Sequence, residues 1–200
     1  MKRFVFFLVL FFTSRQFLHA QTLNPNYLKD AYRKGFVVPN KDSIYYQRLF
    51  FKALPSNFKT FFSYYGWDEK KQMGRPLTGV PPNYFKRIFN STAYSQLAVI
   101  KKIIEISING IYCPDAIGSF QRSSYEFAEA HNAQFVNELN AFSKPEIVSM
   151  WKFYFDYPSS FVRRSVYSKL CKVTALNNRR MVPLITEGYE KAVAKWATHH

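Results

Sequence analysis

Apolar side chains recur at helical spacing along most of the chain. Between positions 58 and 65, four aromatic residues lie at i, i+3, i+4 and i+7: Phe58, Phe61, Phe62 and Tyr65. This spacing places them on one face of an α-helix, with lysine, threonine and serine on the other. A second stripe contains Leu97, Ile100, Ile104 and Ile108. Both stripes predict amphipathic helices whose apolar faces form a core.

Capping and breaking residues set the bounds of the predicted helices. Helices are expected over residues 42–53, 84–89, 95–109, 114–130 and 132–140. Ser143 and Glu146 form a capping box at the start of a further helix, with Pro145 in its first turn. Tyr157-Pro158 ends that helix, and Ser159 and Pro183 lie near the starts of two more.

No stretch shows strand-like alternation, and no Asn-Gly hairpin turn lies between alternating apolar residues. The fold class is therefore all-α, a single-domain irregular helical bundle of about eight helices. An α-solenoid-like stack is the alternative. Because the sequence has no repeat period, the bundle is favoured.

The first 20 residues have the pattern of a signal peptide. Lys2 and Arg3 precede a nine-residue apolar run over 4–12, and Ala20 ends a short polar segment. The apolar run is about half of the roughly 20 residues that span a bilayer, so a retained signal-anchor is the weaker alternative. We expect a periplasmic or secreted protein with a signal peptide at 1–20, an extended lead-in at 21–41 containing one short helix near 27–34, and an all-α domain at 42–200.

The chain is strongly basic. Its formal net charge is +15, and removal of residues 1–20 removes Lys2, Arg3 and Arg15 but no acid, which leaves +12. A charge of this size indicates the kind of partner rather than the fold. Nucleic acid is not expected outside the cell membrane, so an acidic protein, an anionic envelope polymer or a lipid headgroup surface remains. The alternative is that the charge only confers solubility.

Two cysteines, Cys113 and Cys171, lie after the predicted cleavage site. An even number of cysteines in an oxidising compartment predicts one disulfide between them. The alternative is two separate buried thiols, because free cysteine packs like a small apolar residue.

The segment 66–82 is the longest stretch rich in glycine and proline, and it also carries acids and bases. Loops of this length are often functional, although a mobile connection is the alternative. Aromatic residues and arginine dominate the energetics of many interfaces. The predicted partner-binding residues are Tyr64, Trp67, Asp68, Lys70, Lys71 and Arg75. The pairs Arg163-Arg164 and Arg179-Arg180 could extend this positive surface if the fold brings them close.

Patterns of catalytic or metal-binding residues are missing from the sequence. The histidines after residue 20 are His131, His199 and His200, and none has metal-ligand spacing. We expect no metal, no cofactor and no nucleophile–base pair. A hydrolase that uses paired carboxylates is the remaining enzyme hypothesis, with Glu126, Glu129 and Glu138 as candidates.

Several segments resemble a pattern in uncharacterised exported proteins of Gram-negative bacteria. They are LPSNFK-x-F at 54–61, YGWD at 65–68, Pro76-Leu77, IYCPDAIGSFQ at 111–121 and FYFDYP at 153–158. The resemblance implies an all-α exported protein, and small proteins of this kind are often immunity proteins that neutralise a toxin.

Two functional hypotheses follow. The first is a periplasmic binding protein of the immunity or inhibitor type, whose acidic protein partner could be a toxin. The alternative is an envelope-associated module that binds an anionic glycan or lipid surface without spanning the membrane.

Overall fold

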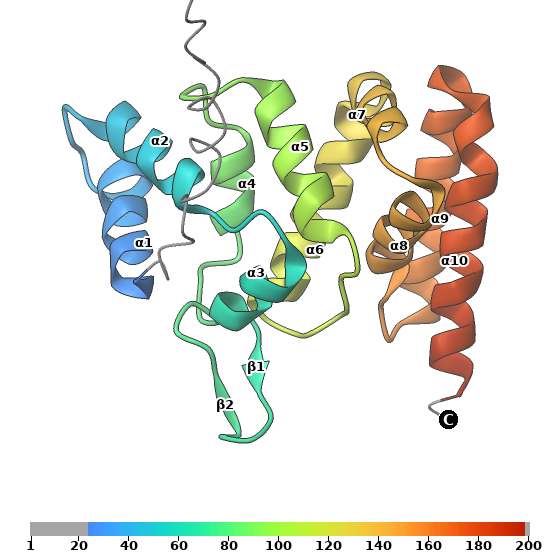
Figure 1. Ribbon diagram of the computed structural model, residues 1–200, viewed down its shortest axis with the longest axis horizontal. Coiled ribbons are helices and arrows are strands. Elements are labelled where there is room, and N and C mark those ends of the chain that lie inside the picture. Colours follow the sequence, from blue (N-terminus) through green and yellow to red (C-terminus); the bar gives the residue numbers. More distant parts are fainter. Residues whose placement is uncertain (1–23, 199–200) are drawn as a thin grey trace, which may run out of the picture.

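The computed structural model describes residues 24–198 (Figure 1). These residues contain ten α-helices and one short hairpin. The helices are α1 Pro25–Tyr32, α2 Ser43–Ala53, α3 Phe58–Tyr65, α4 Tyr84–Phe89, α5 Gln96–Ser107, α6 Ala116–Ala130, α7 Asn132–Glu138, α8 Lys144–Phe155, α9 Ser160–Asn177 and α10 Val182–Ala197. The hairpin consists of β1 Trp67–Asp68 and β2 Met73–Gly74. The predicted all-α single domain is confirmed.

Sequence order runs along the long axis of the molecule. Figure 1 shows α1 and α2 at one end of this axis, α3 to α6 in the middle, and α10 at the other end. The hairpin projects from the body below α3. In the part of the chain that the structure describes, no helix is long and apolar enough to cross a membrane.

Polar side chains cap the starts of several helices. Asn57 accepts a hydrogen bond from the Thr60 backbone N–H at 2.9 Å, so it is the cap of α3. At the start of α8, the Glu146 carboxylate accepts from the Ser143 backbone N–H at 2.8 Å. The predicted capping box is therefore present.

The segment predicted as an extended lead-in is largely helical. Asn24 caps α1, Pro25 occupies its first turn, and a π-helix over Arg33–Val37 follows directly. Leu28 is fully buried, and the Tyr32 ring lies 4.0 Å from the Tyr84 ring. The short helix predicted near 27–34 is present as α1, whereas the extended conformation predicted for the rest of the segment was wrong over Arg33–Val37. Burial of α1 against α2 and α4 holds this region in place. The predicted signal peptide lies outside the described residues.

The aromatic stripe of α3 faces the core, as predicted. Phe58, Phe61 and Tyr65 are buried, and Phe62 is half-buried. The ring centroids of Phe61 and of Phe120 on α6 lie 4.6 Å apart. These rings therefore contribute mainly to stability.

Helix α10 packs against α8 and α9 at the far end of the molecule (Figure 1). Gly188 allows a close approach of α10 to α8, because a Cβ at this position would lie 2.7 Å from the Trp151 Cβ and 2.9 Å from the Lys152 backbone nitrogen. The Trp151 side chain is fully buried at this contact.

Candidate functional site

The segment predicted as a binding loop forms a hairpin. β1 and β2 pair antiparallel, with Trp67 opposite Gly74 and Asp68 opposite Met73. A four-residue turn joins them, and Gln72 adopts a left-handed conformation with φ of 50°. The expectation that strands are absent was therefore wrong for this segment. Two residues per strand are too few to show alternation, and the turn lacks an Asn-Gly pair.

An ion pair fixes the shape of the hairpin. The Arg75 guanidinium lies 2.9 Å from the Asp68 carboxylate, whose side chain is mostly buried. The Asp68 carboxylate also accepts a hydrogen bond from the Lys71 backbone N–H at 3.3 Å. Asp68 and Arg75, which the sequence predicted as partner-binding residues, therefore hold the hairpin together.

Backbone hydrogen bonds continue the connection into the body. The Arg75 N–H donates to the Gly66 carbonyl at 3.0 Å, and the Leu77 N–H donates to the Tyr64 carbonyl at 2.8 Å. The Thr78 hydroxyl donates to the Tyr65 carbonyl at 3.1 Å. Leu77 is buried, so the second strand of the hairpin is anchored where it returns to the core.

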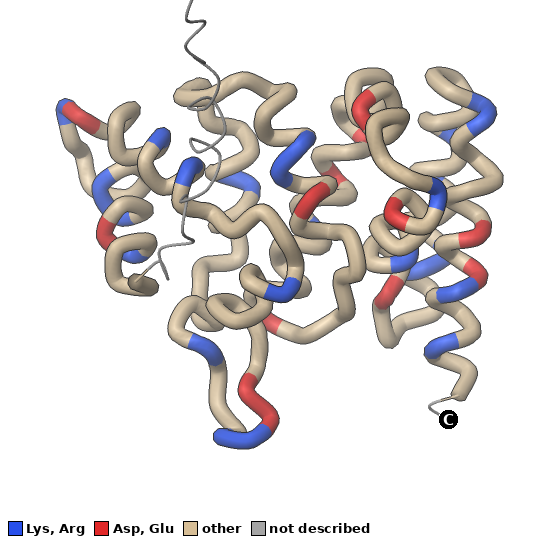
Figure 2. The backbone as a smooth tube through the Cα atoms, viewed as in Figure 1, with Lys and Arg blue, Asp and Glu red and all other residues tan. Residues whose placement is uncertain are grey.

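The remaining predicted site residues divide into two groups. Lys70 and Lys71 are exposed at the end of the hairpin next to the exposed acid Glu69, and Figure 2 shows both basic and acidic residues there. Tyr64 and Trp67 are half-buried at its base. Met73, which the sequence analysis did not select, is 53% exposed beside the two lysines. Its position next to the turn is the signal that could have identified it.

The other two basic pairs lie near opposite ends of α9. Arg163 is buried and donates to the carbonyls of Tyr157 and Pro158, the latter at 3.1 Å. Arg179 and Arg180 follow the other end of α9, whose 18 residues span about 27 Å. One continuous positive surface is therefore not formed by these pairs.

The predicted disulfide between Cys113 and Cys171 is not formed, and both cysteines are free. Cys113 lies between α5 and α6, where its thiol contacts the backbone of Trp67. Cys171 lies on α9 beside Tyr167. Burial raises the pKa of both thiols. The alternative of two separate, partly buried thiols is the one that the structure has, because the fold gives each sulfur different neighbours.

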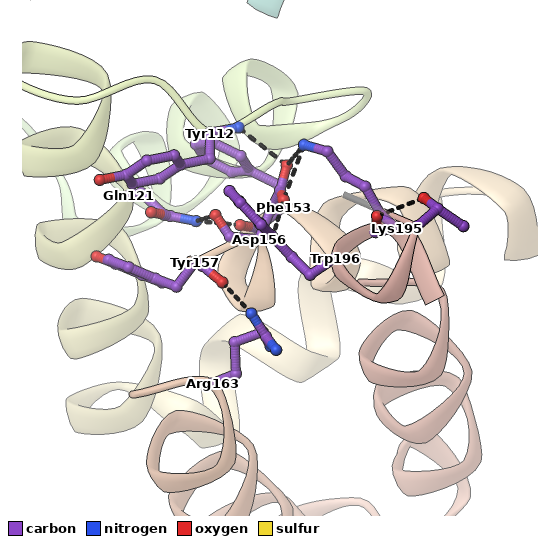
Figure 3. Close-up of polar contacts among 9 residues, drawn as sticks. Tyr112, Gln121, Phe153, Asp156, Tyr157, Arg163, Lys195 and Trp196 are labelled. Carbon is purple, nitrogen blue, oxygen red and sulfur yellow. Dashed lines mark hydrogen bonds and ion pairs between the residues drawn. The ribbon is translucent and has the colours of Figure 1, made fainter. Parts of the chain in front are cut away.

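A buried polar cluster, which we call the Asp156 cluster, lies at the end of α8 (Figure 3). Both carboxylate oxygens of Asp156 contact the Lys195 ammonium, at 2.7 and 2.9 Å. The Trp196 indole N–H donates to the same carboxylate at 2.8 Å, and the Tyr112 backbone N–H donates at 3.0 Å. The carboxylate is fully buried and its oxygens are engaged by these donors. We interpret the cluster as a structural tie that holds the end of α10.

The Asp156 cluster also joins two of the segments on which the resemblance rests. Gln121, from the segment 111–121, donates to the carbonyls of Phe153 and Asp156 in the segment 153–158. Tyr157 is buried, and this burial raises its pKa to about 12, so its phenol is neutral. Only the tertiary structure reveals that these two segments contact each other. The sequence showed no more than an aspartate within an aromatic run.

The three carboxylates of the enzyme hypothesis have different surroundings. Glu138 lies 3.6 Å from the Lys101 ammonium, whereas Glu126 is exposed on α6. Glu129 lines a shallow cavity of about 410 Å³ with His131, whose ring contacts Gln96. Glu129 is the one carboxylate among the residues that line it. These positions provide no pair of carboxylates facing a common cavity.

A second shallow cavity, of about 400 Å³, lies between the start of α3 and the end of α5. Glu105 and Glu146 line it together with Phe58 and Phe142. Hydrogen bonds from Ser143 lower the pKa of Glu146, so this carboxylate serves the α8 cap. Across residues 24–198, no group of three or more histidine, cysteine, aspartate or glutamate side chains could hold a metal ion.

Comparison with known proteins gives no family. No family model, no curated protein and no solved structure matches this chain.

Proposed function

We propose that this chain is an exported binding protein of the immunity or inhibitor type, and that its hairpin contacts an acidic protein partner. The observation that carries this proposal is the hairpin itself, which projects from the body and exposes Lys70, Lys71 and Met73 (Figures 1 and 2). Export rests on the signal-peptide pattern of residues 1–20, and the immunity role rests on the resemblance of the sequence segments.

The internal contacts of the hairpin support a role in binding. The Asp68–Arg75 ion pair and the anchored Leu77 order the segment before any partner arrives. A preorganised element loses less conformational entropy on binding than a mobile loop does. This reduces the cost of association.

The two exposed lysines of the hairpin suit an acidic partner. Lys70 and Lys71 would attract acidic side chains and accelerate the encounter, an effect that salt weakens. Met73 offers a flexible apolar side chain that can adapt to a neighbouring surface. The contact set we propose is therefore narrower than the one predicted from sequence, and it gains Met73.

A capture experiment tests the proposal. The chain from residue 21 is immobilised at moderate salt, and proteins bound from the producing cells and from neighbouring bacteria are identified by mass spectrometry. The captured protein is then purified, and its toxicity on delivery to the periplasm is measured with and without this chain. We expect one stoichiometric acidic protein whose toxicity the chain neutralises.

The variant K70E/K71E and its matched control K169E/K172E make the same change in net charge. Lys169 and Lys172 are exposed on α9, and Figure 1 shows this helix in a different part of the molecule from the hairpin. We expect K70E/K71E to weaken binding by about tenfold or more and the control to bind nearly as well as the wild type. Equal losses in both variants would assign binding to net charge and would overturn the role of the hairpin.

A further inference from the structure

The turn before α2, together with the last residue of the π-helix and the first turn of α2, carries a concentrated group of exposed apolar side chains. Val37 is 56% exposed, Val38 43%, Ile44 45% and Tyr45 58%, all within nine consecutive residues. We call residues 37–45 the apolar turn. Two other highly exposed apolar residues, Phe161 and Leu176, lie 15 positions apart on α9, or about 22 Å along the helix. Several exposed apolar side chains within so short a segment indicate an interaction surface.

The apolar turn has an ordered connection to the fold. The Val38 N–H donates to the Arg33 carbonyl at 2.9 Å, and the Gln47 side chain donates to the Gly35 carbonyl at 2.7 Å. Leu28 and Phe50 are fully buried and anchor the two helices on either side. The apolar side chains are therefore held outward by the backbone.

The position of the apolar turn suits contact with a broad surface. Figure 1 shows the connection between α1 and α2 at one end of the long axis. Because the turn lies at one end of the molecule, it can contact a flat surface without steric clashes between that surface and the other helices.

Basic residues outnumber acidic ones in the segment that contains the apolar turn. Residues 24–53 contain six bases, Lys29, Arg33, Lys34, Lys41, Arg48 and Lys52, and two acids, Asp30 and Asp42. Asp30 is paired with Lys34 at 2.7 Å and with Arg33 at 3.2 Å. Asp42 is exposed beside Lys41. The excess of positive charge complements an anionic surface.

We infer that the apolar turn inserts into the headgroup region of an anionic lipid bilayer, while the surrounding bases contact lipid phosphates. Val37, Val38 and Ile44 gain from leaving water only if the partner has an apolar layer, which lipid has and an anionic polysaccharide lacks. Tyr45 has the amphipathic ring that is favoured at membrane interfaces. Lys41 would lie close to the phosphates and strengthen binding.

This membrane contact is independent of the hairpin. The apolar turn and the hairpin belong to different parts of the molecule, with the hairpin projecting below α3 in Figure 1. A protein bound to the membrane by the apolar turn would keep the hairpin available for a protein partner. The two proposals can therefore fail separately.

Vesicle co-sedimentation tests the inference. The chain from residue 21, which retains every described residue, is mixed with vesicles of phosphatidylethanolamine and phosphatidylglycerol, or of phosphatidylcholine alone. We expect binding to the anionic vesicles and weaker binding to the neutral ones. The absence of binding to the anionic vesicles would overturn the inference.

The variant V38D/I44D and its matched control F161D/L176D add the same negative charge at exposed positions. We expect V38D/I44D to weaken vesicle binding by about tenfold or more, because it removes two inserted side chains, and the control to lose much less. Circular dichroism of both variants checks that the helical fold is retained. An equal loss in the two variants would overturn the role of the apolar turn.

Sedimentation velocity without lipid tests whether the apolar turn binds a second copy of the chain instead of a lipid surface. A concentration-dependent dimer that V38D/I44D abolishes would overturn the membrane assignment and make the apolar turn a self-association surface. A monomer that binds anionic vesicles supports the inference. Capture of the toxin partner by V38D/I44D at wild-type strength would show that the two surfaces act separately.

Discussion

The carboxylate of Asp156 contacts the Lys195 ammonium across 39 residues of sequence, and both of its oxygens participate, at 2.7 and 2.9 Å. Asp156 closes α8 and Lys195 lies in the last turn of α10. This pair fixes the end of the final helix against the body of the protein.

Removal of the ammonium should destabilise the protein. In Lys195→Met the buried Asp156 carboxylate keeps the Trp196 and Tyr112 donors but loses its counter-charge. We expect a loss of about 2 kcal/mol in the free energy of unfolding, below the full value for a buried pair because Lys195 is partly exposed. Urea denaturation measures it. The control Lys191→Met breaks an exposed pair with Glu187 and should cost much less.

Gly188 should tolerate no larger side chain without rearrangement of α8 and α10. The added Cβ in Gly188→Ala would meet the Trp151 Cβ and the Lys152 backbone nitrogen, and neither is the flexible end of a side chain. We expect a loss of about 1–3 kcal/mol in stability despite the better helix propensity of alanine. Thermal unfolding tests this, with Gly79→Ala as the control, because a Cβ there meets no atom within 4 Å. Equal melting temperatures for wild type and Gly188→Ala would contradict the close approach.

Loss of the Arg75 side chain should affect the local ordering of the hairpin more than the free energy of unfolding of the whole protein. In Arg75→Ala the mostly buried Asp68 carboxylate loses its ion pair. We expect faster amide hydrogen exchange over 66–78 with a global change of about 1 kcal/mol or less, because the guanidinium is partly exposed. Lys70→Ala, at an exposed position, should leave the exchange unchanged. Unaltered exchange in Arg75→Ala would show that the backbone contacts are sufficient to order the hairpin.

His131 should make the stability depend on pH. Burial lowers its pKa below the ordinary 6.5, so the unfolded chain takes up a proton at a higher pH than the native protein does. The contribution of the neutral imidazole to stability is therefore fully present above pH 6.5, the ordinary pKa. It is lost as the pH falls below that value toward the lowered pKa of the folded protein. We expect the melting temperature to decrease from pH 7 toward about pH 5, and the decrease to be smaller in His131→Gln.

That pH window separates His131 from the carboxylates. Hydrogen bonds lower the pKa of Glu146 and Glu187 below the ordinary 4.5, so their effects begin at lower pH. A pH dependence identical in wild type and His131→Gln would assign the effect to other groups.

The two cysteines should titrate as thiols. Both are half-buried, and burial raises the pKa of each, so the native protein should react slowly with a thiol reagent. Denaturant should expose two reactive thiols, and a reducing agent should leave the melting temperature unchanged. A protein purified from the periplasm that shows no free thiol and loses stability on reduction would contradict the structure.

The sequence by itself determined the fold class and many helix bounds. The spacing of Phe58, Phe61 and Tyr65 defined the buried face of α3, and Ser143 with Glu146 defined the start of α8. These signals act over three or four residues, within one turn of helix, and so they can be identified without knowledge of any other segment.

Only the tertiary structure decided which distant residues meet. Asp156 contacts Lys195, and Cys113 and Cys171 have separate neighbours instead of each other. The shape of the hairpin also depends on the Asp68–Arg75 pair, and the position of α1 against α2 and α4 depends on burial. These features arise from the packing of complete helices, whose relative positions depend on many weak contacts at once and not on any local pattern of residues.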